Sequence, residues 1–447
     1  MEKEEKNLEE QIKSVAQKFL EASKGKSIDV ISHFDTDGIT SATIMIQTLK
    51  KLEIPFTITI VKSLGEETIK KLSKSDKKIT LFLDLASNSI HHILNHGIKN
   101  VFIIDHHQII QSIPDEINMI NPELSGQQKI SSSGITYLFC REINNDVKDL
   151  AKLAILGMIG DLMEKSVDKL NNEILDDGNI KRKRGLLVYP ATRPINRVLE
   201  LSSDPYIPGV TGNSKGVLEL LREAGITPVN GAYKSLIELD EEEMGKLITG
   251  VMLRNPKTKS ESIIGDIFLI KFFNKLEDAR ELSAKINACS RSGESALAIQ
   301  LCMEIPNSAK KVETIYVKYK QEIVSSLKFA LETKKIDGRG FVILNAEDKI
   351  KDTMIGTIAS IISNSNLYEE GTVIISMAYY DDKIKVSARN IGKVGRNVRE
   401  ILQNAVAEIG GEVGGHEFAA GCNILKKNEK RFLELVRKEF ELEVIKV

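Results

Sequence analysis

The chain has 447 residues, a formal net charge of −1, 28% charged residues and 42% hydrophobic residues. This length exceeds what one compact core accommodates, so we expect two or three domains. The near-zero net charge excludes a uniformly basic surface, and a polyanionic ligand would have to be held in a local groove. Because tryptophan is absent and aromatic residues are only 5%, extended base stacking along a nucleic-acid strand is expected to be modest.

The composition indicates a soluble, cytoplasmic protein with no membrane contact. No apolar run approaches the roughly 18 residues of a membrane span. The first six residues mix both charges, which is unlike a signal peptide. The four cysteines lack a paired C-x-x-C spacing, which argues against a structural zinc site and a disulfide framework; they are Cys140, Cys289, Cys302 and Cys422.

The first third of the chain alternates strands with helices. An amphipathic helix comes first, with apolar residues at 8, 12, 15 and 19. Short apolar runs at 28–32, 56–61, 79–83 and 101–104 then predict strands, separated by helices at about 39–52, 66–72 and 90–94. This alternation predicts an α/β fold whose parallel sheet has right-handed crossovers.

Three of these four strands end in acids or histidines. These residues are His33, Asp35 and Asp37 after the first strand, Asp84 after the third, and Asp105, His106 and His107 after the fourth. The carboxyl ends of such strands are where ligands bind, although polar residues there also cap the helices that follow. A helix from about residue 150 carries Asp161 in an apolar run. A buried, unpartnered aspartate costs several kcal/mol, so we expect a metal ion, or alternatively an internal Arg or Lys, beside it.

The ligand chemistry favours a pair of hard divalent cations. Carboxylates and imidazoles without thiolates suit Mn²⁺ or Mg²⁺ better than a structural zinc. Four or five aspartates exceed what one divalent ion needs, so two ions bridged by one carboxylate are expected. Such a pair activates water and clamps a phosphoryl group.

Two polar segments each allow two interpretations. Ser131, Ser132, Ser133 and Gly134 precede an apolar helix at 135–139 and either cap it or bind an anion at its N-terminus. The basic run 181–184, followed by Arg193 and Arg197, is either a solvated charged turn or a patch that contacts phosphates. Further along, the mostly helical stretch 285–305 contains Asn287 and Arg291.

The final third predicts a second, smaller α/β domain. Strands are expected at 341–344, 372–377 and 383–388, and helices at 354–363 and 394–407. The segment 410–421 contains two pairs of glycines beside His416. Paired glycines allow close backbone approach, so His416 is expected to contact a substrate, the alternative being a simple turn.

Together these motifs resemble the DHH phosphoesterase superfamily, and within it the archaeal RecJ-like exonucleases that associate with GINS. The matching residues are Asp105-His106-His107, the first motif at 33–38, Asp84, Gly160-Asp161, Gly414-Gly415-His416 with 419–421, Ser387-Ala388-Arg389, 287–291, and 187–190 with 208–209. The resemblance implies an N-terminal DHH catalytic domain (1–165), a middle region (166–305) and a C-terminal DHHA1 substrate-binding domain (306–447), the two α/β domains facing each other across a cleft.

The resemblance also implies roles for individual residues. One Mn²⁺ (or Mg²⁺) would be held by His33, Asp35 and Asp84, and a second by Asp37, Asp84, His106 and Asp161. His33 departs from many bacterial relatives, which carry Asp or Asn there. The implied catalytic residues are His107, at the scissile phosphate, and Asp105, which orients the histidines. The implied substrate-binding residues are Arg291, Arg389, Gly414, Gly415 and His416.

The function implied is a metal-dependent exonuclease for single-stranded DNA or RNA in replication or repair, with either polarity. A phosphodiesterase or phosphatase for short oligonucleotides or nucleotide phosphates is an alternative, although the long middle region favours longer polymers. A replisome scaffold is a third hypothesis, because some relatives have lost the metal ligands; this chain keeps them. Binding to GINS of the replicative helicase complex is a further implied partnership.

Overall fold

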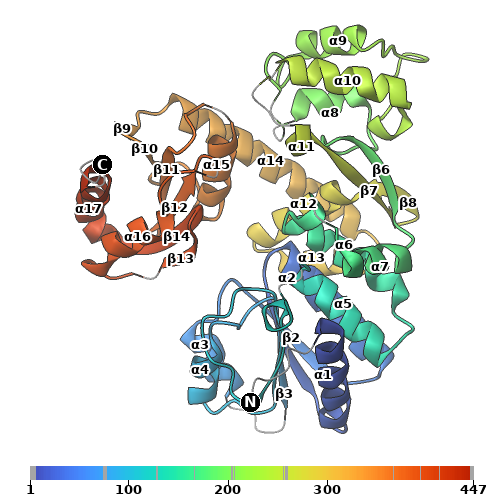
Figure 1. Ribbon diagram of the computed structural model, residues 1–447, viewed down its shortest axis with the longest axis vertical. Coiled ribbons are helices and arrows are strands. Elements are labelled where there is room, and N and C mark those ends of the chain that lie inside the picture. Colours follow the sequence, from blue (N-terminus) through green and yellow to red (C-terminus); the bar gives the residue numbers. More distant parts are fainter. Residues whose placement is uncertain are drawn as a thin grey trace. The chain divides into compact units, whose positions relative to one another are not determined.

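The computed structural model describes residues 7–73, 78–126, 129–165, 167–202, 205, 207–254, 256, 260–365, 367–392, 394–411 and 413–442 (Figure 1). The chain divides into two compact units, Met1–Tyr316 and Val317–Val447. The predicted three-domain division stays a prediction, and its boundary residue 166 lies outside the described residues. Among the described helices, none is both long and apolar enough to cross a bilayer.

The first unit is built on a five-stranded parallel sheet with the order β2-β1-β3-β4-β5. Its strands are β1 (Ile28–His33), β2 (Phe56–Val61), β3 (Ile79–Leu83), β4 (Val101–Ile104) and β5 (Ile117–Ile120). The predicted parallel sheet is confirmed. The fifth strand was not predicted, because its four residues include the polar Asn118 and lie between Pro114 and Pro122.

Helices cover both faces of this sheet, so the central strands are apolar on both sides. The helices are α1 (Leu8–Ser23), α2 (Thr36–Lys51), α3 (Glu66–Leu72), α4 (Ile90–Asn95), α5 (Ser132–Ile143), α6 (Ala151–Gly160) and α7 (Lys169–Asp177). Val30, Leu81 and Phe102 pack against α1, α2, α5 and α6 on one face. The neighbouring residues Ile31 and Phe82 pack against α3 and α4 on the other.

Helix α2 begins three residues earlier than predicted. Asp35 is its N-cap and accepts a hydrogen bond from the amide of Gly38 at 3.0 Å. This cap draws Asp37 into the first helical turn, where the sequence had suggested a loop. Asp37 therefore stands on a rigid element.

The rest of the first unit has a three-stranded antiparallel sheet and a set of helices. They are β6 (Lys181–Leu186), α8 (Ile195–Leu201), α9 (Ser214–Glu223), α10 (Glu241–Arg254), α11 (Ser260–Ile263), β7 (Ile264–Phe272), β8 (Lys275–Asp278), α12 (Ala279–Arg291) and α13 (Ser295–Cys302). The basic run is strand β6, so its interpretation as a charged turn was wrong, and its interpretation as a phosphate-contacting patch stays a prediction. Arg182 and Arg184 lie near Asp266 of β7 (3.7 and 3.9 Å), and Lys183 donates to backbone carbonyls of a loop.

The second unit contains a mixed six-stranded sheet with the order β13-β14-β12-β11-β10-β9, in which only β10 and β11 pair in parallel. Its elements are β9 (Ile336–Gly338), β10 (Phe341–Asn345), α15 (Asp352–Asn364), β11 (Val373–Tyr380), β12 (Lys383–Asn390), α16 (Val398–Ala407), β13 (Val413–His416), β14 (Ala419–Leu425) and α17 (Glu429–Leu442). Helix α14 (Ser308–Glu332) has residues in both units. The predicted second α/β domain is confirmed.

Candidate metal centre

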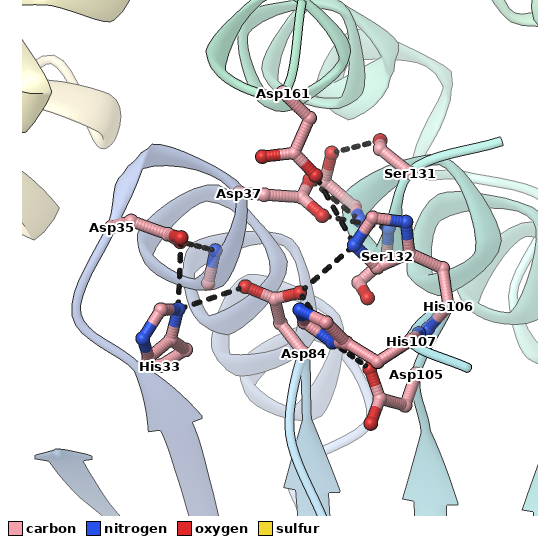
Figure 2. A network of polar contacts seen from close by, with 12 residues as sticks. His33, Asp35, Asp37, Asp84, Asp105, His106, His107, Ser131, Ser132 and Asp161 are labelled. Carbon is pink, nitrogen blue, oxygen red and sulfur yellow. Dashed lines mark hydrogen bonds and ion pairs between the residues drawn. The ribbon is translucent and has the colours of Figure 1, made fainter. Parts of the chain in front are cut away.

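The polar strand ends predicted from the sequence converge at one edge of the parallel sheet. His33 ends β1, Asp84 follows β3, and Asp105, His106 and His107 follow β4. Figure 2 shows that Asp35 and Asp37 from the start of α2, and Asp161 from the end of α6, point into the same site. Eight predicted site residues thus lie together although they come from four separate segments of the chain.

Two groups of potential ligands lie side by side and meet at Asp84. In the first group, Nδ1 of His33 lies 2.9 Å from Oδ2 of Asp35 and 3.4 Å from Oδ2 of Asp84. In the second group, Nε2 of His106 lies 3.2 Å from Oδ2 of Asp161, with Asp37 close by. The other oxygen of Asp84, Oδ1, lies 3.5 Å from Nε2 of His106. Asp84 therefore turns one oxygen toward each group.

Asp84 is a buried acid surrounded by other acids. It is 2% exposed, and neither of its oxygens accepts a hydrogen bond within the part of the chain that is described. Burial, followed by the charges of Asp35, Asp37 and other nearby aspartates, raises its pKa well above the usual value. A buried carboxylate that accepts no hydrogen bond is costly unless another charge neutralises it. The carboxylate and imidazole ligands around Asp84 fit divalent cations, which would supply that charge. Its backbone is left-handed (φ 59°), a conformation that aspartate tolerates better than most residues.

In the second group, the pKa values of Asp37 and His106 are both raised. Burial, and then the charge of Asp161, raises the pKa of Asp37 to about 7. Burial alone would lower the pKa of His106, but its hydrogen bond with Asp161 and the nearby carboxylates raise that pKa to about 9. A bound cation would take the place of these protons, since metal ligands must be deprotonated.

Asp105 and His107 form a hydrogen-bonded pair next to the two groups. Nδ1 of His107 also lies 3.9 Å from Oδ1 of Asp84, so His107 makes a third possible ligand group with Asp84 and His106. Oδ1 of Asp105 accepts hydrogen bonds from Nδ1 of His107 at 2.7 Å and from the amides of His106 and His107. Its Oδ2 accepts the amide of Ser87 at 3.0 Å. The hydrogen bond to Asp105 raises the pKa of His107. The His107 side chain is half-exposed, and its Nε2 takes no part in the pairing with Asp105. Burial alone would raise the pKa of Asp105, but His107 outweighs it and lowers that pKa.

The chain matches three family models in order along its length: the DHH family N-terminal domain at residues 27–158, the DHH-CID domain at 189–262 and the DHHA1 domain at 338–442. A curated relative, the uncharacterized protein MJ0831 of Methanocaldococcus jannaschii, is 30% identical over 446 residues that cover 96% of each chain. The chain belongs to the DHH superfamily.

Solved structures share the fold of this DHH protein. Cdc45 from Entamoeba histolytica has a TM-score of 0.68 at 12% identity and covers 96% of this chain and 98% of its own. RecJ in complex with Mn²⁺ from Thermus thermophilus has a TM-score of 0.60 at 18% identity and covers 96% of this chain. The DHH protein spans about half (54%) of that RecJ chain. A manganese-bound exonuclease RecJ, with a TM-score of 0.59 and 18% identity, is matched over 93% of its length.

Arg291 of the DHH protein lies beside the first ligand group. Its guanidinium sits over the ring of Phe34 at 5.9 Å from the centroid, and its Nε donates to Oδ1 of Asn287 at 3.1 Å. The ring of Phe34 in turn packs edge-on against His33 at 4.9 Å. Arg291 is therefore placed next to residues of the candidate metal centre, and its predicted substrate role stays a prediction.

The other predicted substrate residues belong to the second unit. Arg389 on β12 donates from Nε to Ser360 at 3.0 Å and from its terminal nitrogen to the carbonyl of Ala388 at 2.8 Å. Gly414, Gly415 and His416 form the exposed edge strand β13. Gly415 has a φ of 114° and packs tightly against the backbone of β14, so a side chain would not fit there. Their substrate contacts remain predictions.

Sequence reasoning missed the residues that hold the site in shape. The side chain of Asn121, fully buried after β5, donates to the carbonyl of His107 at 2.9 Å and to Oγ of Ser87 at 3.1 Å. No sequence signal marked it, because β5 itself was not predicted. Ser131 does cap α5, accepting the amide of Gly134 at 3.2 Å. The helix N-terminus also binds an anion, and that anion is the carboxylate of Asp37.

Proposed function

We propose that this protein is a two-metal phosphodiesterase that hydrolyses single-stranded DNA or RNA from an end. The observation that carries the proposal is the buried carboxylate of Asp84, which has no hydrogen-bond donor among the described residues and lies between two groups of ligands. His33 and Asp35 would complete one cation site, and Asp37, His106 and Asp161 the other. When bound, two such cations supply an activated water and stabilise charge on the phosphoryl oxygens.

The remaining residues of the site bind and orient the substrate in this proposal. His107 contacts the scissile phosphate and carries a proton toward the leaving oxygen, while Asp105 fixes its ring through Nδ1. Arg291 binds the nucleotide beside Phe34 and His33. In the second unit, Arg389 and the Gly414–His416 strand bind a phosphate of the substrate.

Two alternatives make different predictions. A phosphatase for nucleotide phosphates or short oligonucleotides would use the same centre but would turn over dinucleotides faster than 20-mers. A replisome scaffold is the second alternative, and it is suggested by the fold shared with Cdc45. Such a scaffold would need no cations. The scaffold hypothesis leaves the raised pKa and the missing donors of Asp84 unexplained.

The proposal is tested by digestion of strands labelled at the 5′ or the 3′ end, as DNA and as RNA, with Mn²⁺, Mg²⁺ or EDTA. We expect stepwise shortening from one end with metal and none with EDTA. Asp84→Asn keeps the shape of the side chain but removes its charge, and we expect a loss of roughly 10³-fold or more in rate, since charge at the reacting phosphoryl group is the main source of catalysis.

Asp149→Asn is the matched control, because Asp149 is exposed and pairs with the surface residue Lys51. Its rate is expected to equal that of the unmodified protein. Full activity of Asp84→Asn in purified protein would overturn the two-metal assignment. Activity confined to dinucleotides would favour the phosphatase alternative.

A further inference from the structure

The carboxylate of Asp37 is held at the N-terminus of α5 by two backbone amides. The amide of Ser132 donates to Oδ2 at 2.7 Å, and the amide of Ser133 donates to Oδ1 at 3.0 Å. All three residues are fully buried. The first amides of a helix have no partners within the helix and favour negative charge, so this contact orients a carboxylate and stabilises its ionised form.

Gly157 of α6 leaves the space that this carboxylate occupies. A Cβ at this position would lie 2.3 Å from Oδ1 of Asp37 and 2.0 Å from Oγ of Ser133. Oγ of Ser133 is itself fixed, because it donates to the carbonyl of Ala154 at 3.1 Å and lies 2.9 Å from Oγ of Ser131. Neither neighbour can move away without breaking hydrogen bonds, so only glycine fits.

We infer that the amides of Ser132 and Ser133, together with the gap at Gly157, preset Asp37 for one of the two cations. The inference rests on the proposed two-metal function and adds that the affinity of one cation site is set by α5. Ser132, Ser133 and Gly157 are positioning residues, since they act through Asp37. Contacts of this kind, which orient a metal ligand from behind, change metal affinity by roughly 10- to 100-fold.

Ser132 offers a matched pair of variants that separates its amide from its side chain. Ser132 is the first residue of α5, where proline is tolerated because the missing N–H has no helical partner. The preceding Ser131 has the extended backbone (φ −74°, ψ 161°) that proline requires. Ser132→Pro therefore removes the donor to Asp37, whereas Ser132→Ala keeps it and removes a hydroxyl that has no hydrogen-bond partner among the described residues.

The readout is Mn²⁺ binding, measured by titration calorimetry and by electron paramagnetic resonance. We expect Ser132→Ala to bind two ions as the unmodified protein does. We expect Ser132→Pro to bind one ion with roughly 10- to 100-fold lower affinity. With two Mn²⁺ added per protein molecule, its resonance spectrum should shift from that of a spin-coupled pair toward that of a single bound ion.

Gly157→Ala disturbs the position of the Asp37 carboxylate from the side of α6. It replaces Ser132→Pro as the test if that variant does not fold. Ile155→Ala is its control, because Ile155 lies two residues away on α6, is fully buried in the apolar core and faces roughly the opposite side of the helix. We expect Gly157→Ala, but not Ile155→Ala, to lose the spin-coupled signal when two Mn²⁺ are added per protein molecule.

The outcomes separate this inference from the proposed function. Two ions bound with unchanged affinity by both Ser132→Pro and Gly157→Ala would overturn the role of α5. Fewer than two ions bound by the unmodified protein would overturn the two-metal centre itself.

Discussion

At the scale of single residues, three left-handed backbone positions lie at or beside the candidate metal centre. Asp84, Ala86 and Leu162 all have positive φ, with values of 59°, 90° and 57°. Asp84 belongs to the ligand groups, and Leu162 directly follows Asp161. A left-handed conformation costs a non-glycine residue roughly 1–2 kcal/mol. Such strain persists where the surrounding structure enforces it, most often at functional sites.

The strain at Leu162 can be measured by replacing this residue with glycine. Its side chain is 73% exposed, so Leu162→Gly removes little apolar burial while it relieves the strain at φ 57°. After allowance for the conformational freedom of glycine, we expect the free energy of unfolding in urea to rise by roughly 0.5–1 kcal/mol. In the control Leu253→Gly, which is 75% exposed but helical, the free energy should fall by a similar amount. Destabilisation of both variants would show that the Leu162 backbone is not strained.

At the scale of secondary-structure elements, Phe19 is the aromatic member of the buried face with which α1 packs against the sheet. The ring of Phe19 meets Phe102 of β4 and Phe139 of α5 edge to face, with centroids 5.3 and 5.4 Å apart. Because Phe19 is fully buried, we expect Phe19→Ala to lower the free energy of unfolding by roughly 3–5 kcal/mol. Leu20→Ala, at the edge of the same helix, should change it by less than roughly 1 kcal/mol. Equal losses in the two variants, measured by urea denaturation, would contradict this view of α1.

The strands that the sequence predicted carry two different patterns. Strands β1, β3 and β4 are buried and appear as largely apolar runs, whereas the edge strand β2 is half-buried and alternates apolar residues with exposed threonines. Strand β6 was missed because its charged residues find partners on β7 and in a loop, and residue type alone does not show such partners. The predicted start of α2 was three residues too late because Asp37 and Gly38 are typical of turns. The cap at Asp35 includes both residues in the helix.

In the candidate site, the potential metal ligands were predicted from the sequence, but the residues that position them were not. The acids and histidines were visible because each ends a predicted strand or interrupts an apolar helix. The residues behind them were not, since the amides of Ser132 and Ser133 act through the backbone and reach Asp37 across 95 and 96 positions in sequence. Backbone donors carry no residue-type signal. Gly157 is informative only once the space that it leaves is known.

At the scale of the whole molecule, helix α12 packs directly against the elements that bear the candidate metal centre. Oγ1 of Thr36, between Asp35 and Asp37, donates to the carbonyl of Ser283 on α12 at 3.2 Å. Arg280 at the start of α12 pairs with the buried Glu164 at 3.0 Å. These segments belong to one compact unit. Charge changes at the centre should therefore be felt as changes in the stability of this unit.

The pKa shifts fix how that stability depends on pH in the metal-free protein. The pKa of Asp37 is raised from 3.8 to about 7 and that of His106 from 6.5 to about 9. A group with a raised pKa stabilises the folded state below its unfolded pKa, and this contribution is lost as the pH rises through the folded pKa. Asp35 and Asp105 have lowered pKa values, so their contributions are already complete above pH 6. All the change between pH 6 and 9 therefore has one sign.

We expect the melting temperature of the EDTA-treated protein to fall steadily from pH 6 to pH 9. Mn²⁺ should raise the melting temperature at each pH, and the gain should widen as the pH rises, because the cation no longer competes with protons on Asp37 and His106. Scanning calorimetry at pH 6, 7, 8 and 9, with and without Mn²⁺, measures both trends. In Asp84→Asn the gain from Mn²⁺ should be largely lost, since the carboxylate shared by the two ligand groups is gone. A gain that narrowed with rising pH would show that protons and cations do not compete for these groups, and the assignment of Asp37 and His106 as ligands would fail.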